Sequence, residues 1–230
     1  MSGRGAAWRV GAVLLGLSGG AAWGADVESL RRGYLRALER FEHGPGGALE
    51  RVFESGLEAA RALEAVTPRV EDAPRLRGFI PSEEAGRIRW SPEPRFFHEL
   101  AERRGTEVDE AFFSLLRRTY YRDGALRVYA APSGCDVFDH PELEPLYRNW
   151  TRFWATHPRA YPAKVDREVT ALEDVVARST CACGDAASVE AGLERFLKSF
   201  PRSPVAPRVQ ARLEQVRAGT SDVRFRCPAG

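Results

Sequence analysis

Four cysteines carry the most definite chemistry in this sequence. Cys181 and Cys183 are separated by one residue, while Cys135 and Cys227 lie far from them along the chain. Zinc sites and redox-active pairs usually contain Cys-x-x-Cys, a spacing that these four residues do not offer. An even number of cysteines instead predicts two structural disulfides if the chain folds in an oxidising compartment.

The spacing of the cysteines limits how they can pair. A bond between Cys181 and Cys183 is excluded, because so small a ring does not allow normal disulfide geometry. Two connectivities remain open: Cys135 with Cys181 and Cys183 with Cys227, or the crossed alternative. In the chain-entropy model, each bond contributes about 4 kcal/mol. Either pairing ties Cys227 to the Cys-Ala-Cys turn.

Carboxylates and an imidazole follow Cys135. Asp136, Asp139 and His140 could bind a divalent metal ion or supply a general base. The same residues fit a helix start, with Asp139 as the capping residue ahead of Pro141. We prefer the helix start, and we keep as the alternative a small metal-assisted hydrolase centred on Asp136, Asp139 and His140.

Other candidate catalytic groups lack their expected partners. His98 and Glu102 stand one helical turn apart, but a zincin motif would need a second histidine at the position of Glu102. A solvated pair is the better interpretation. Ser114, Ser133 and Ser203 lack the Gly-x-Ser-x-Gly setting of an activated nucleophile. The sequence thus favours a protein that is not an enzyme, with the hydrolase as the alternative, and it predicts no cofactor.

The first 24 residues have the three-part organisation of a secretory signal peptide. Arg4 and Arg9 give a positive start, residues 10–17 are apolar, and small residues lead to a cleavage site after Gly24. The apolar run is shorter than the roughly 20 residues that span a bilayer, so cleavage is favoured over anchoring. We expect a periplasmic or secreted protein.

The net charge of the chain argues against some classes of binding partner. The formal charge is +2, and the signal holds two arginines and no acid, so the mature chain is close to neutral. A neutral chain with interleaved charges argues against nucleic acid or an anionic membrane as a partner. Lys164 and Lys198 are the only lysines among many arginines, which we interpret as the coding bias of a high-GC bacterium.

Apolar residues recur at three- and four-residue steps in seven or eight segments, which predicts an all-α fold. We expect a multi-helix bundle or an irregular array of helical hairpins, with minor short strands. Residues 25–230 would form one domain: an N-terminal helical hairpin at 26–66, an irregular middle at 67–140, and a disulfide-tied helical part at 141–230.

Local signals mark several elements in more detail. Residues 78–80 and 87–90 can form a brief strand pair, and Ser91-Pro92 is typical of a helix start. Thr106 and Asp109 predict a capping box. An aromatic stripe at helical spacing is expected to be core: Tyr147, Trp150, Phe153 and Trp154.

One segment resembles a known family. At 193–206, Leu-Glu-Arg-Phe-Leu-Lys-Ser-Phe-Pro-Arg-Ser-Pro-Val-Ala resembles the helix-to-helix junction of tetratricopeptide-type repeats in periplasmic assembly proteins. The likeness covers residues 186–218 and does not recur at the repeat spacing of about 34 residues. It implies a helical scaffold that binds protein partners, and it transfers no catalytic residue.

These observations favour a non-catalytic interaction protein with an unknown protein partner. The final predicted hairpin could form a groove for a partner helix or peptide. Its expected lining is Phe196, Phe200 and Val209, with Arg212 at the rim.

Overall fold

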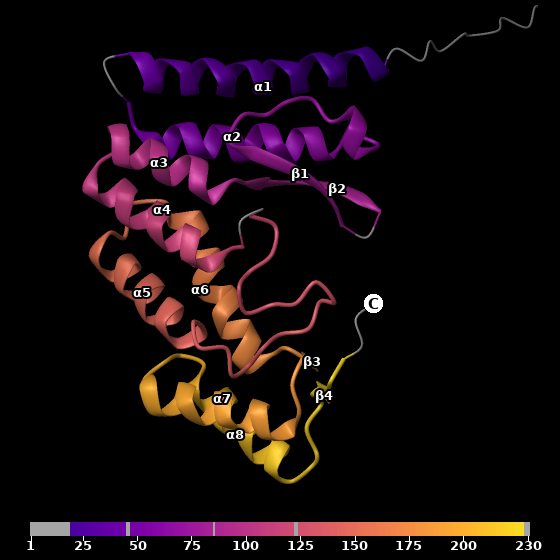
Figure 1. The fold of residues 1–230 in the computed structure, drawn as a ribbon, viewed down its shortest axis with the longest axis vertical. Helices are drawn as coiled ribbons and strands as arrows, with labels where there is room; N and C mark the ends of the chain where they lie inside the picture. The colour runs from indigo at the N-terminus through magenta and orange to yellow at the C-terminus, as the bar shows by residue number, and fades with distance from the viewer. Residues whose placement is uncertain (1–18, 45–46, 85, 122–123, 228–230) are drawn as a thin grey trace, which may run out of the picture.

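The computed structural model describes residues 19–44, 47–84, 86–121 and 124–227. Within these ranges the chain forms eight α-helices and two short two-stranded sheets, so the predicted all-α class with minor strands is confirmed (Figure 1). Most of the predicted signal peptide lies outside the described residues, and residues 19–24 form the start of the first helix. The helices are α1 (Gly19–His43), α2 (Leu49–Glu64), α3 (Pro94–Arg104), α4 (Glu107–Thr119), α5 (Leu143–Thr156), α6 (Pro162–Ala177), α7 (Ala186–Ser199) and α8 (Ala206–Arg217).

The first two helices form the predicted hairpin. Tyr34, Leu38 and Phe41 recur at helical spacing on α1 and are buried against α2. Gly56 on α2 permits this close packing, because a Cβ atom there would lie 2.5 Å from the ring of Phe79 and 2.8 Å from that of Tyr34. The Tyr34 hydroxyl reaches past the hairpin and donates to a backbone carbonyl 2.5 Å away.

The predicted strand pair forms; it is antiparallel, and its second strand packs against α2. Strands β1 (Phe79–Glu84) and β2 (Arg87–Pro92) pair along their whole length. The predicted helix start at Ser91-Pro92 is wrong, since both residues end β2 and α3 begins at Pro94. The physical reason is that the Glu93 N–H donates to Gly78 O at 2.9 Å, which extends the strand pairing past Pro92.

The predicted capping box at the start of α4 is confirmed. Thr106 Oγ1 accepts from the Asp109 N–H at 3.2 Å, and Asp109 Oδ2 accepts from the Thr106 N–H at 2.8 Å. The remaining oxygen of Asp109 accepts from the Tyr161 hydroxyl at 2.5 Å. This bond joins α4 to the residue before α6, inside a cluster of aromatic rings from Phe53, Phe97, Phe112, Phe113 and Tyr161.

The aromatic stripe of α5 is buried, with one exception. Tyr147, Trp150 and Phe153 belong to the core, as predicted. The indole N–H of Trp150 donates to Thr119 Oγ1 at 2.9 Å and so ties α5 to α4. Trp154 is 41% exposed, so its assignment to the core is wrong. It stands next to Phe153 in sequence, and a helix rotates adjacent residues to different faces.

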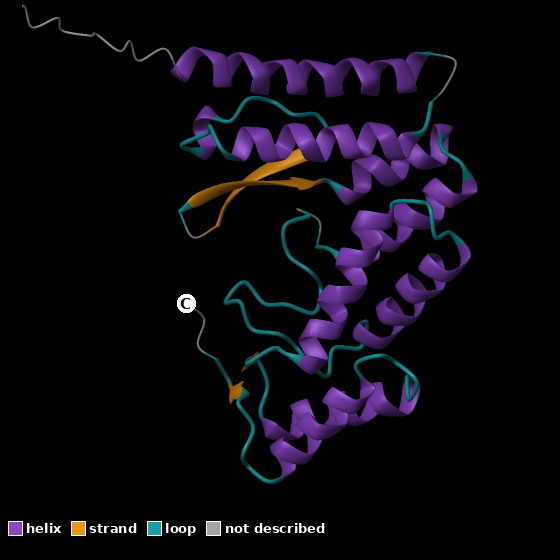
Figure 2. Ribbon diagram, turned by 180° about the vertical axis from the view of Figure 1, so that it is seen from behind, coloured by secondary structure: helices purple, strands orange, loops and turns teal. Residues whose placement is uncertain are grey.

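Helix α6 occupies the middle of the molecule, between the α1–α2 layer and the α7–α8 hairpin (Figure 1). Two-residue strands, β3 (Cys181–Ala182) and β4 (Arg224–Phe225), pair in parallel near the C-terminus. Seen from behind, the β1–β2 hairpin, the long connection between α4 and α5, and the C-terminal strands lie on one side of the molecule (Figure 2). Helices α3 to α5 lie on the other.

The buried apolar side chains form one connected cluster, which extends from Tyr34 in α1 to Val223 before β4. Every helix in the described part of the chain is too short or too polar to span a bilayer.

Candidate functional site

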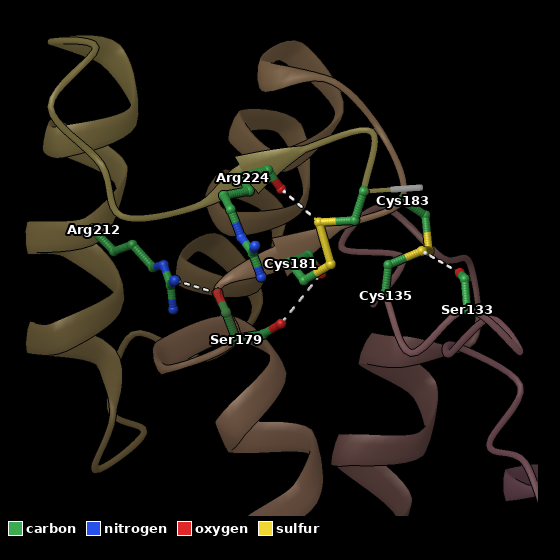
Figure 3. The surroundings of a disulfide bond; sticks show 8 residues. Ser133, Cys135, Ser179, Cys181, Cys183, Arg212 and Arg224 are labelled. Atoms are coloured by element: carbon green, nitrogen blue, oxygen red, sulfur yellow. Dashed lines mark hydrogen bonds between the residues drawn. A yellow bond between two sulfur atoms is a disulfide. The ribbon is translucent and has the colours of Figure 1, made fainter. Parts of the chain in front are cut away.

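All four cysteines are bonded, which confirms the prediction of two disulfides and selects the crossed connectivity. Cys135 pairs with Cys183, and Cys181 pairs with Cys227. The Cα atoms are 5.1 Å and 5.9 Å apart, within the usual range. Figure 3 shows the two bonds side by side, where the chain before α7 meets the C-terminal segment.

Backbone hydrogen bonds connect the segments that the disulfides join. The Asp136 N–H donates to Cys181 O at 3.0 Å, and the Cys183 N–H donates to Asp136 O at 3.0 Å. The Cys227 N–H donates to Ala182 O at 3.1 Å. Three distant parts of the chain therefore meet as a small patch of strand-like pairing, which both disulfides reinforce.

The proposed metal ligands do not converge in the structure. Among the described residues there is no group of three or more histidine, cysteine or carboxylate side chains able to hold a metal ion. Asp136 is half-buried, and this burial raises the pKa of its carboxyl. His140 Nδ1 accepts a hydrogen bond from the Glu142 N–H at 3.1 Å, and burial lowers the pKa of its imidazole.

The predicted capping role of Asp139 is also wrong. Helix α5 begins at Leu143, two residues after Pro141, and no side chain caps it. Turns precede the helix instead: the His140 N–H donates to Val137 O at 3.1 Å, and the Leu143 N–H donates to His140 O at 3.1 Å. These turns keep Pro141 outside the helix.

The predicted docking residues of the last hairpin are mostly part of its interior. Phe196 and Val209 are fully buried, while Phe200 is partly buried and packs against the Tyr147 ring. The placement of Arg212 at an exposed rim is wrong, because this residue is only 4% exposed.

Arg212 is held inside by the segments that follow α6 and α8. Its guanidinium donates to Ser179 O, as Figure 3 shows, and pairs with Asp222 at 3.2 Å. Burial lowers its pKa. Arg212 therefore joins the end of α6 to the C-terminal segment, and it offers no charged rim to a partner.

A feature that the sequence did not predict is a cleft of about 890 Å³ between α2, β2 and α6. Gly124 lines the cleft and approaches β2 closely: a Cβ atom on this glycine would lie 2.1 Å from Pro92 O, and its φ of +68° favours glycine. The basic side chains that line the cleft are Arg51, Arg61, Arg89, Arg127, Lys164 and Arg167, and the acidic ones are Glu54, Glu58, Glu64 and Glu84.

A buried carboxylate lies beneath the α6 wall of this cleft. Glu168 is fully buried, and its two oxygens are shared between Lys164 Nζ at 2.6 Å and Arg127 Nε at 3.1 Å. The Tyr120 hydroxyl donates to the same carboxylate at 2.7 Å. The side chains of Lys164 and Arg127 are 10% and 27% exposed, and both lie over the Tyr120 ring.

Burial and charge oppose each other within this group, which we call the Glu168 cluster (Tyr120, Arg127, Lys164 and Glu168). Burial alone would raise the pKa of Glu168, but Lys164 and Arg127 outweigh it, and the pKa is lowered. Burial lowers the pKa of Lys164, although Glu168 acts in the opposite direction. Burial also raises the pKa of Tyr120, which keeps the hydroxyl protonated as a donor.

One buried hydrogen-bond donor of a residue that lines the cleft has no acceptor. Trp90 lies on β2 with 5% of its surface exposed, and its Nε1 makes no hydrogen bond within the described part of the chain. Leaving such a group unpaired costs about 1–3 kcal/mol. The cleft thus combines apolar and aromatic side chains with basic and acidic groups, a combination typical of ligand sites.

A weak signal for this site exists in the sequence. Lys164 and Glu168 have the spacing of an ordinary surface ion pair, and Lys164 is one of only two lysines. Neither fact reveals that Arg127, in the segment between α4 and α5, folds over Lys164 and Glu168. The pair therefore resembles many exposed pairs until the long-range contact is known.

The remaining candidate histidine is not part of this cleft. His98 is buried on α3, and its Nδ1 lies 3.4 Å from Glu102 Oε2. The predicted pair between His98 and Glu102 therefore forms. Glu102 is exposed to solvent as predicted, but the prediction that His98 is solvated is wrong, because His98 is buried. The two residues line a smaller pocket of about 440 Å³ with Arg117 and Tyr121.

Comparison with known proteins gives this site no template. Neither a protein-family model, nor a curated protein, nor a solved structure matches the chain.

Proposed function

We propose that this chain is an exported, non-catalytic helical protein that binds a partner in the cleft between α2, β2 and α6. The observation that carries the proposal is the cleft itself, whose volume of about 890 Å³ lies within the range of ligand-binding sites. Among its described lining residues, the serines Ser55 and Ser91 have no histidine beside them to act as a base.

A periplasmic location is supported by three features. The chain starts with a charged, apolar and small-residue pattern, it contains two disulfides, and its basic residues are nearly all arginine. Disulfides persist in oxidising compartments, of which the periplasm is one. Mass spectrometry of the protein from its native cell should give an N-terminus near Ala25.

A scaffold role is supported by how the C-terminal half is held. The disulfides and Arg212 fix α7 and α8 to the end of α6, and α6 in turn provides one wall of the cleft. The resemblance of 186–218 to tetratricopeptide-type junctions agrees with a partner-binding protein. Pre-organisation of this kind lowers the entropic cost of binding.

Photo-cross-linking in intact cells tests the proposal. A photoreactive residue would replace Glu58 on the α2 wall, and in a control variant Arg152 on α5, which is exposed and does not line the cleft. Adducts of defined mass from position 58, without equal adducts from position 152, would support binding in the cleft. The same pattern from both positions would contradict it.

Metal analysis separates this proposal from the hydrolase alternative. A hydrolase centred on Asp136, Asp139 and His140 requires one equivalent of metal, which an Asp136→Ala, His140→Ala double variant would lose. We expect purified protein to contain no stoichiometric metal. A bound equivalent that depends on these residues would replace the binding-protein proposal.

A further inference from the structure

We propose that the α6 wall of the cleft is a binding site for an oxyanion, the carboxylate or phosphate group of a small organic molecule. Arg127, Lys164 and Arg167 would hold this group. The inference rests on the proposed function, because it names the class of ligand that the same cleft takes.

Charge is the first argument. Arg127 and Lys164 share the single carboxylate of Glu168, so the Glu168 cluster carries a net charge of +1 when both cations are protonated. Asp136 is a further carboxylate on which the charge of Arg127 acts, and its burial raises its pKa. Arg167 stands one turn from Lys164 on the same wall and makes no ion pair among the described residues. A buried or half-buried surplus charge is unfavourable unless a counter-charge approaches it.

Mutual repulsion among these cations is the second argument. Arg127 and Arg167 both act on Lys164 in the direction that lowers its pKa, in addition to burial. An anion placed between the three side chains would relieve the repulsion and favour the protonated lysine. The arrangement therefore discriminates against neutral ligands of the same shape.

Unused hydrogen-bond donors are the third argument. Arg127 donates to Glu168 through Nε, and its two terminal nitrogens have no acceptor among the described residues. A guanidinium with both terminal nitrogens available matches the two oxygens of a carboxylate or phosphate.

The aromatic and apolar surroundings indicate that the anion belongs to an organic molecule. Leu57, Trp90 and Pro92 line the cleft beyond the cationic wall, and its volume greatly exceeds that of one oxyanion. An organic body attached to the anionic group would cover these side chains and remove water from the ion pairs.

The two lysines provide a selective probe of this site. Protein labelled with ¹³C at the lysine Cε should give two signals, one from Lys164 in the cleft and one from Lys198 on the exposed side of α7. Sodium phosphate and sodium acetate are titrated separately against sodium chloride at constant ionic strength. A Lys198→Arg variant assigns the signals.

We expect the Lys164 signal to shift saturably with phosphate or acetate, while the Lys198 signal follows the chloride control. The anion that saturates first identifies the source as a phosphate or a carboxylate. Arg167→Gln should weaken the apparent affinity about threefold, as expected for one exposed charge. Arg152→Gln, an equal charge change on α5, should leave the affinity unchanged.

Equal responses of the two lysines, or equal affinities of the Arg167→Gln and Arg152→Gln variants, would overturn the anion site. Both substituted arginines are exposed, so neither variant depends on tolerating a buried change. The titration and the photo-cross-linking experiment test different statements. Cross-linked adducts at position 58 without a response of Lys164 to anions would support the proposed function and contradict the anion site. A response of Lys164 without such adducts would support the anion site and contradict the proposed function.

Discussion

Tyr161 and Asp109 are joined by a buried hydrogen bond of 2.5 Å between the tyrosine hydroxyl and one carboxylate oxygen. The other oxygen of Asp109 belongs to the capping box of α4, so a single side chain both starts one helix and fixes the residue that precedes another. Tyr161 has a left-handed backbone with φ of 51° and stacks on Phe112 with ring centres 3.7 Å apart. This bond sets the position of α6 relative to α4.

Replacing Tyr161 with phenylalanine should lower the free energy of unfolding by about 1–3 kcal/mol. The change retains the ring and its stacking but leaves an oxygen of Asp109 buried without a donor. Urea denaturation measures the difference. Tyr121→Phe is the matched control, because the Tyr121 side chain is exposed, and we expect it to change stability by less than about 0.5 kcal/mol. Equal effects of the two variants would contradict the role given to Tyr161.

Replacing Gly192 with alanine should destabilise the protein severely, although alanine is the better helix former. A Cβ atom at this position on α7 would lie 2.2 Å from Phe138 O, so the helix could no longer pack against the backbone beside Cys135–Cys183. We expect a loss of about 3 kcal/mol or more, by analogy with overpacked cores. Thermal unfolding followed by circular dichroism provides the test.

Gly33→Ala is the control for that prediction. Gly33 also lies within a helix, and a Cβ atom there would meet no other atom within 4 Å. The substitution should therefore raise stability by about 0.5–1 kcal/mol through helix propensity alone. A gain of stability at both positions would show that α7 does not press on the segment at Phe138.

Replacing Glu168 with glutamine should abolish part of the acid sensitivity of the protein. The folded pKa of Glu168 is lowered, so its carboxylate stabilises the fold at neutral pH, and this stabilisation is lost as the pH falls from the unfolded value of 4.5 through the folded pKa. At pH 7 the variant leaves Lys164 and Arg127 without their counter-ion, a loss of about 3–5 kcal/mol.

Denaturation curves at pH 7 and at pH 3 test this expectation. The difference in stability between wild type and Glu168→Gln should be large at pH 7 and should shrink at pH 3. Glu99→Gln serves as the control, since Glu99 pairs with Arg95 on the surface and such pairs contribute less than about 1 kcal/mol. A difference that does not depend on pH would argue against a stabilising carboxylate.

Replacing Asp136 with asparagine should stabilise the protein at pH 7, whereas Glu168→Gln should destabilise it. Burial raises the folded pKa of Asp136 above its unfolded value of 3.8, so the carboxylate opposes folding at pH values above the folded pKa. Asparagine resembles the neutral form, and the variant should melt at a higher temperature than wild type at pH 7 and at the same temperature below the unfolded pKa. Asp139→Asn, an equal charge change at an exposed site, should show no such gain.

The parts of this fold that depend on local sequence could be predicted. The spacing of Tyr34, Leu38 and Phe41 defines helix α1. Thr106 and Asp109 form the capping box of α4 within four residues, so neither feature needs a distant contact. The number of disulfides followed from composition. Their pairing did not, because it depends on where the backbone at Asp136 meets Cys181 in space.

The errors arise where distant segments decide the outcome. Arg212 belongs to the polar face of an amphipathic helix by its sequence, but the chain after α8 returns and covers it. Ser91-Pro92 has the composition of a helix start, but Gly78 offers its carbonyl to the next residue and the strand continues. The Glu168 cluster was missed for the same reason, since Arg127 reaches it from another segment.

The two disulfides add covalent connections between parts of the chain that the backbone already links. Cys135–Cys183 and Cys181–Cys227 span 48 and 46 residues, and their spans overlap at the Cys-Ala-Cys turn. A protease that cuts the backbone once, anywhere between positions 135 and 227, therefore releases no fragment until a disulfide is reduced. Loss of a peptide from this half of the molecule requires either a second cut or a reductant.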